Sequence, residues 1–157
     1  MSTEELARLG EDSLKERLLE QATFAHMKHR PLTPDSLPGL LADPDCVRYP
    51  TRLVYEFGEM AMHQFAQPDL DLGDPEGRGR VLYLRPMLRD HPDLALLAVA
   101  YMLPVINYGE IIQDEHCLLY GAALLGLMQE EFYKKICDLA DFVGSETRYP
   151  SERGVDL

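Results

Sequence analysis

Residues 90–133 constrain the fold more than any other part of the chain, because these 44 residues include neither Lys nor Arg. They are also the most apolar part of the sequence, with long apolar runs at Leu94–Ile106 and Cys117–Met128. Seven acidic residues lie among them. Carboxylates in apolar surroundings need a partner or take up a proton. We therefore expect this segment to form the core, and its acids to find partners in other segments, in His91 or His116, in a bound cation or in water.

Length and charge narrow the class of protein. A chain of 157 residues has the size of one domain, and we assign residues 1–157 to a single domain. Fifteen Lys and Arg against 27 Asp and Glu give a net charge of −12. This charge argues against binding to a nucleic-acid backbone or to an anionic membrane, because both partners attract basic surfaces.

The cysteines and the apolar runs predict a cytoplasmic location. Cys46, Cys117 and Cys137 are scattered and form no Cys-x-x-Cys pair, which suits a reducing compartment rather than a disulfide framework or a zinc site. The first ten residues lack the apolar core and the positive start of a signal peptide. The apolar runs are shorter than the roughly 20 residues that span a bilayer, so we expect no membrane segment.

Hydrophobic spacing and capping residues predict an all-α fold, a single-domain bundle of five to seven helices. The predicted helices cover residues 3–29, 34–42, about 44 or 50 to 66, about 92–103, 110–125 and 129–143. A Pro-rich connection at 31–50, a turn-rich loop at 67–80 and a loose tail at 145–157 complete the domain. Residues 81–86 resemble a short extended segment without a visible partner strand.

A polar face on the predicted helix at 51–66 is the first candidate site. Four polar residues fall on one side of this helix, namely Arg52, Glu56, Glu59 and His63. One interpretation is a solvated face with pairs at i,i+4 spacing. The other is a polar pocket in which Glu59 and His63 act as acid/base groups or as ligands.

The second candidate is the predicted helix at 110–125, which is apolar almost all round and is therefore expected to be buried. A narrow strip on it holds Asn107, Glu110, Asp114, Cys117 and Gly121. We expect Glu110 and Asp114 to be buried and to carry the perturbed pKa values that cluster at functional sites. The alternatives are an internal salt bridge to Arg85, Arg89 or Arg52, and a subunit interface.

Three further residues have an ordinary structural interpretation. His26 and His29 lie near the end of the first predicted helix, where we expect them to cap carbonyl groups rather than bind metal. Cys117 lies on a predicted buried helix, where a thiol is usually inert.

The stretch from Asp93 to Gly144 resembles the carboxymuconolactone decarboxylase and alkylhydroperoxidase D-like superfamily. The similar segments are DLALLAVAYML, GEIIQDEH, AALLGLMQEEF and ADFVG, preceded by Phe57-Gly58-Glu59 and Pro68-Asp69-Leu70. Together they cover residues 55–144. Members of this superfamily are small, all-helical and oligomeric, so the resemblance implies an alkylhydroperoxidase D-like arrangement of helices and a homo-oligomer.

The sequence departs from both branches of this superfamily. The peroxidase branch has Cys-x-x-Cys followed by His, whereas this chain has His116-Cys117-Leu118-Leu119-Tyr120, which argues against dithiol chemistry. The decarboxylase branch has a Glu four residues before a His. Alignment on Gly126 places Asp114 at the Glu position and Leu118 at the His position. Matching Glu110 and His116 instead requires a two-residue shift.

Three hypotheses of function follow. The first is a small-molecule enzyme in which Glu110, Asp114 and His116 act as general acid/base groups, with Glu59 or His63 from a neighbouring helix. The second is a metal-carboxylate helical bundle that adds Glu56 to these residues, although the Glu-x-x-His signature of di-iron bundles is absent. The third is a non-catalytic oligomer or partner-binding module. No cofactor is predicted.

Overall fold

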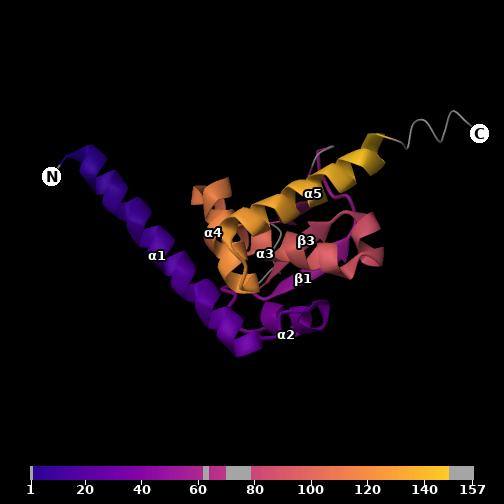
Figure 1. Ribbon diagram of the computed structural model, residues 1–157, viewed down its shortest axis with the longest axis horizontal. Helices are drawn as coiled ribbons and strands as arrows, with labels where there is room; N and C mark the ends of the chain where they lie inside the picture. The colour runs from indigo at the N-terminus through magenta and orange to yellow at the C-terminus, as the bar shows by residue number, and fades with distance from the viewer. Residues whose placement is uncertain (1, 62–63, 70–78, 149–157) are drawn as a thin grey trace, which may run out of the picture.

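The computed structural model describes residues 2–61, 64–69 and 79–148, and it describes only the backbone of 146–148. This part of the chain is mostly helical and also contains a small three-stranded sheet (Figure 1). The α-helices are α1 (Thr3–His29), α2 (Leu37–Leu41), α3 (Pro92–Tyr108), α4 (Asp114–Leu125) and α5 (Gln129–Arg148). The strands are β1 (Thr51–Tyr55), β2 (Ala66–Asp69) and β3 (Arg80–Leu84). Short 3₁₀ helices are η1 (Pro34–Ser36), η2 (Pro86–Asp90) and η3 (Gly109–Ile111).

The sheet corrects the predicted all-α fold class. Residues 51–55 form β1, so the predicted helix that was to reach residue 66 does not exist there, and its polar face is not formed. β3 pairs in parallel with β1 and antiparallel with β2, which gives the strand order β1-β3-β2. The segment TRLVY is rich in β-branched and aromatic residues, which favour a strand once a partner is present. The residues around 81–86 supply that partner.

α3 is the central helix of the core. It contacts α4, α5, β2 and β3, and its buried residues include Ala98, Val99 and Leu103. The helix continues through Pro104, where the sequence had predicted a kink or an end, and it stops at Gly109, whose φ is 72°. The segment Pro92–Ile111 is therefore 20 residues long, and by length and composition alone it would suffice to cross a membrane. Nearly half of its most apolar part is buried inside this fold.

The two helices after α3 confirm two predicted boundaries, the end of α4 and the start of α5, and differ from the prediction at the other two. α4 ends at Gly126, which has a left-handed conformation with φ of 71°, as the glycine there predicted. α4 begins at Asp114 rather than at residue 110, because η3 comes between it and α3. α5 buries the predicted stripe of Phe132, Ile136, Leu139 and Val143, and it continues past Gly144 to Arg148.

α1 contacts α4 from Glu11 onward, and its buried apolar residues lie in its second half. Leu18, Ala22 and Ala25 are fully buried, whereas Leu6 and Leu9 are 57% and 52% exposed. Figure 1 shows the first turns of α1 projecting away from the other elements. The apolar residues that recur at helical spacing along α1 are therefore buried only in its later turns.

Gly121 of α4 is required by the packing of α5. A Cβ atom at this position would overlap the ring of Phe132, which is fully buried. We expect Gly121→Ala to lower the free energy of unfolding by about 1–3 kcal/mol, the usual cost of overpacking a core. Urea denaturation followed by circular dichroism measures this change.

Gly10→Ala is the matched control, because Gly10 lies within α1 and a Cβ atom there would meet nothing within 4 Å. We expect it to raise the free energy of unfolding by at most about 1 kcal/mol, since Ala is a better helix former than Gly. Equal effects of the two substitutions would contradict the packing described above.

Candidate functional site

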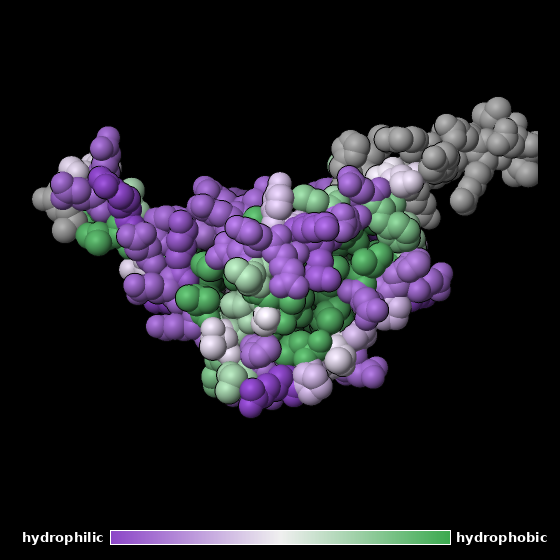
Figure 2. Space-filling model, in the orientation of Figure 1, coloured by the Kyte–Doolittle hydropathy of each residue, from purple (hydrophilic) through white to green (hydrophobic). Residues whose placement is uncertain are grey.

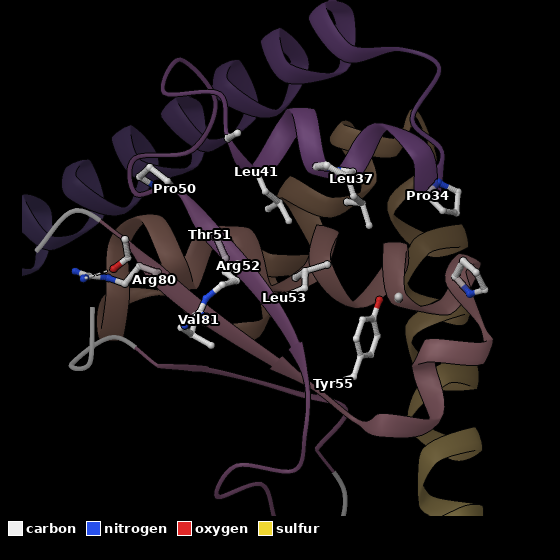
Figure 3. A pocket seen from close by; sticks show the side chains of 15 residues that line it. Pro34, Leu37, Leu41, Pro50, Thr51, Arg52, Leu53, Tyr55, Arg80 and Val81 are labelled. Carbon is white, nitrogen blue, oxygen red and sulfur yellow. Dashed lines mark hydrogen bonds between the residues drawn. The ribbon is translucent and has the colours of Figure 1, made fainter. Parts of the chain in front are cut away.

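A groove of about 880 Å³ lies between the η1–α2 segment and strand β1. Figure 3 shows Leu37 and Leu41 of α2 facing Leu53 and Tyr55 of β1 across it. Ala95 of α3 also lines the groove. In Figure 2 hydrophobic side chains gather in the middle of the face shown, with hydrophilic ones around them. The volume lies within the range of about 300–1,000 Å³ that is usual for ligand pockets.

Local sequence signals create this groove. Thr33 and Ser36 form a capping box around η1, and Pro34 stands in its first turn, which fixes the entry into α2. β1 is an edge strand, because the sheet order is β1-β3-β2. The free side of β1 therefore meets the apolar side of α2 across the groove instead of another of the described strands.

The charge around the groove is opposite to that of the chain. Its described lining includes Arg52 and Arg80 and no Asp or Glu, although the chain as a whole carries −12. The Arg80 guanidinium lies 4.0 Å from the ring centroid of Tyr49, and its Nη1 donates to the carbonyl oxygen of Gly79 at 3.3 Å. Its Nε is buried and has no acceptor among the described residues. An acceptor brought by a ligand would satisfy this donor.

A second, smaller cavity of about 530 Å³ contains one of the predicted site residues, Asp114. Asp114 Oδ1 accepts a hydrogen bond of 2.7 Å from the Tyr101 hydroxyl, and Gln64 and Cys117 also line this cavity. Burial and the hydrogen bond to Asp114 raise the pKa of Tyr101. Burial, with a smaller contribution from Asp114, raises the pKa of Cys117 to about 12, so this thiol is protonated at neutral pH.

His116 is buried but does not line that cavity. Its Nδ1 accepts from the backbone N–H of Gln113 at 2.9 Å, which leaves the proton of the neutral ring on Nε2. Nε2 therefore donates to Glu11 Oε1 of α1 at 2.7 Å. This hydrogen bond is the largest cause that lowers the pKa of Glu11. His116 thus joins α4 to α1, and both of its ring nitrogens are already used.

The other predicted site residues lie apart from Asp114 and His116. Glu110 is exposed on η3, and Glu59 is exposed beyond β1. The expectation that Glu110 and Asp114 are buried is wrong, because α4 starts only at Asp114 and both side chains reach the surface. His63 lies outside the described residues. The described part of the chain therefore does not gather the five predicted residues into one site.

Among the described residues, two groups of side chains have the composition and spacing to hold a metal ion. One is His29, Asp43 and Cys46, and the other is Glu11, Glu115 and His116. In each group the ligand atoms lie within 4.8 Å of one another. Neither group includes Glu56, Glu59, Glu110 or Asp114 from the predicted metal-carboxylate set.

Sequence reasoning missed the groove for one reason. The sequence predicts Arg52 on the polar face of a helix and Arg80 in a loop, whereas the structure places both in strands of one sheet. The sequence TRLVY is itself typical of a strand. Pairing it with the extended segment that begins at Val81 predicts the sheet that forms this wall of the groove. The neighbouring proline-rich segment gave no indication that it would form a pocket wall.

Comparison with known proteins gives no family assignment: no protein-family model, no curated protein and no solved structure matches this chain. The resemblance to the carboxymuconolactone decarboxylase and alkylhydroperoxidase D-like superfamily rests on the sequence segments alone. The groove and the two candidate metal groups are therefore interpreted from their geometry.

The pKa of Glu11 has a consequence for acid stability. A carboxyl group whose pKa is lowered by folding stabilises the native state above its ordinary value of 4.5, and this contribution is lost as the pH falls through the lowered value. We expect Glu11→Gln to reduce the free energy of unfolding at about pH 6 and to have a smaller effect at about pH 3. Urea denaturation at both pH values measures the difference.

Glu16→Gln removes the same charge from an exposed position of α1 and serves as the control. A cost of Glu11→Gln that stays constant between the two pH values would show that the ionised carboxylate of Glu11 does not stabilise the fold.

Proposed function

We propose that this protein binds a small organic anion with an apolar body, and that the binding site is the groove between α2 and β1. One observation carries the proposal: in a chain of net charge −12, the described lining of this 880 Å³ groove includes two arginines and no acidic residue. The chemistry of such a groove fits an amphipathic carboxylate, such as an aliphatic or aromatic acid.

The two parts of such a ligand would be stabilised in different ways. Its apolar body would cover side chains such as Leu37, Leu41 and Leu53, and each buried CH₂ group contributes about 0.8 kcal/mol. Its carboxylate would accept hydrogen bonds from Arg80 or Arg52, whose planar guanidinium groups match a carboxylate in shape and charge. The buried Nε of Arg80 would gain an acceptor at the same time.

An acid/base enzyme is the second candidate, and the cavity beside Asp114 favours it. The carboxylate of Asp114, the hydroxyl of Tyr101 and the amide of Gln64 border one cavity, which offers proton acceptors and donors to a small substrate. This proposal retains the resemblance to the decarboxylase branch, with Asp114 at the Glu position, and with it the proposed homo-oligomer. It predicts that Asp114→Asn abolishes turnover while ligand binding in the groove is unchanged.

Ten-carbon amphiphiles that differ only in the head group test the groove. We expect decanoate, used below the concentration at which it forms micelles, to bind measurably by isothermal titration calorimetry. We expect decyltrimethylammonium, which has the same chain and the opposite charge, to bind about 10-fold more weakly or worse, because one charged hydrogen bond is worth at least 1.4 kcal/mol or so.

Substitution of the groove arginines should reduce the affinity for decanoate alone. We expect Arg52→Gln and Arg80→Gln each to weaken decanoate binding by about 10-fold and to leave decanol binding nearly unchanged. Arg8→Gln is the control, because it removes the same charge from an exposed part of α1. The proposal is wrong if decanoate and the ammonium bind equally well, or if the double variant of Arg52 and Arg80 binds decanoate as the natural protein does.

A further inference from the structure

Three potential metal ligands of different chemistry meet where the end of α1 lies beside the turn after α2. His29 Nε2 lies 2.7 Å from Asp43 Oδ2, and the Cys46 thiol donates to the same oxygen at 3.5 Å. The imidazole and the carboxylate are mostly covered, with side-chain exposures of 17% and 9%, and Cys46 is buried. None of these residues lines the groove between α2 and β1.

The backbone holds two of these ligands in place. The N–H of Asp45 donates to Asp43 Oδ1 at 2.9 Å, and the N–H groups of Cys46 and Val47 donate to the Asp43 carbonyl oxygen. The carboxylate is therefore oriented through Oδ1, and Oδ2 is directed toward His29 and Cys46. The Asp-x-x-Cys spacing across this turn places a carboxylate and a thiol on the same side, as Cys-x-x-Cys does in zinc sites.

We propose that His29 Nε2, Asp43 Oδ2 and Cys46 Sγ bind a zinc ion, with the fourth coordination position open to water. Nitrogen, oxygen and thiolate ligands are those that Zn²⁺ prefers, at about 2.0–2.3 Å in tetrahedral geometry. Two ligand atoms at those bond lengths lie about 3.3–3.5 Å apart. The separation of 3.5 Å between Cys46 and Asp43 already fits, and that of 2.7 Å between His29 and Asp43 has to lengthen by about 0.6–0.8 Å.

The other candidate group is less suited to a metal. His116 could offer Nε2 as a ligand only after its proton moved to Nδ1, and this would break the hydrogen bond from the Gln113 N–H that caps α4. No such bond to Nδ1 of His29 is found among the described residues. The proton that Nε2 shares with Asp43 can therefore move to Nδ1, which leaves the Nε2 lone pair for the metal without disturbing a helix cap.

Lys28 competes for the same oxygen. Its Nζ lies 2.8 Å from Asp43 Oδ2 and 3.1 Å from Asp45 Oδ2. A zinc ion at Oδ2 would displace the ammonium group from Asp43, and Asp45 offers it a second carboxylate. In the metal-free protein Lys28 thus supplies the positive charge that the metal would supply when bound.

Zinc binding at this site releases a proton. Burial, followed by the nearby Asp43 carboxylate, raises the pKa of Cys46 to about 12, so its sulfur carries a hydrogen at neutral pH. When the metal binds, the Sγ–H bond breaks, the Sγ–Zn bond forms, and the proton passes to the buffer. No oxidant or reductant takes part.

A cavity borders the site. Cys46 and Asp45 line this cavity of about 560 Å³, together with Arg17 and Glu20 of α1 and with Asn107 and Tyr108 of α3. The cavity brings solvent next to Cys46. Such access is needed both for entry of the ion and for an open fourth position.

Cobalt substitution tests the proposal directly. Metal-free protein is titrated with Co²⁺ and then with Zn²⁺ in the presence of a chromophoric chelator. We expect one ion per chain and a thiolate-to-cobalt charge-transfer band that Zn²⁺ removes. Cys46→Ser should abolish the band and weaken zinc binding by more than about 100-fold, whereas Cys137→Ser, a free cysteine on α5, should leave both unchanged.

Lys28→Gln is a second variant that tests the zinc site even if Cys46→Ser folds poorly. Removing the competing ammonium should tighten zinc binding by about 10-fold, a gain that a damaged fold cannot produce. The proposal is overturned if the natural protein shows no charge-transfer band, if the band survives in Cys46→Ser, or if Lys28→Gln binds zinc no more tightly. These results are independent of decanoate binding, because the groove does not include these residues.

Discussion

The fold depends on the burial of the apolar helix α3 by the elements around it. This helix has no basic residue and is apolar on most of its circumference, so it is stable only when other elements surround it. α4 and α5 cover part of it, and β2, β3 and the η1 segment contact other parts. α1 cannot complete this cover, because it packs mainly on α4. The small sheet is therefore a structural necessity in a chain that otherwise has the sequence of a helical bundle.

The same constraint explains the placement of acidic residues in the segment without bases. Asp114 is near the N-terminus of α4, where it accepts a hydrogen bond from Tyr101, and Glu115 lies 3.8 Å from Lys15 of α1. Glu110 is exposed. Carboxylates at the start of a helix are also favoured by its dipole. In α3 and α4 apolar residues occupy the middle of the helix, and the acidic residues lie at its start, where water and other elements reach them.

Local signals predicted those parts of the fold that local interactions determine. Gly126 ends α4 at the predicted boundary, and the apolar spacing of Phe132, Ile136 and Leu139 marks the buried face of α5. The strands could not be predicted in the same way, because β1 depends on β3, which starts 29 residues after it. The sequence of residues 51–66 also fits a helical period, and only pairing with the distant strand β3 favours a strand over a helix there.

The candidate sites show the same division. Asp114 was identified from its place on an apolar helix, and it does border a cavity. The partners expected for Asp114 were arginines, whereas the residues beside it are the neutral Tyr101 and Gln64. No periodic pattern in the sequence marks these two residues. Arg80 and the ligand set of His29, Asp43 and Cys46 come together only through tertiary contacts between separate segments. Spacing along the sequence carries little information about such contacts.

The projecting start of α1 makes local stability uneven along one helix. Residues 2–10 are exposed, so their helical hydrogen bonds are not supported by burial. An unsupported helix of this length is marginal in water, and its population depends on end effects such as the Ser2 side chain accepting from the N–H of Glu5. These first turns therefore open and close by a helix–coil equilibrium of their own. The later turns of α1, from Leu18 onward, open only when the core does.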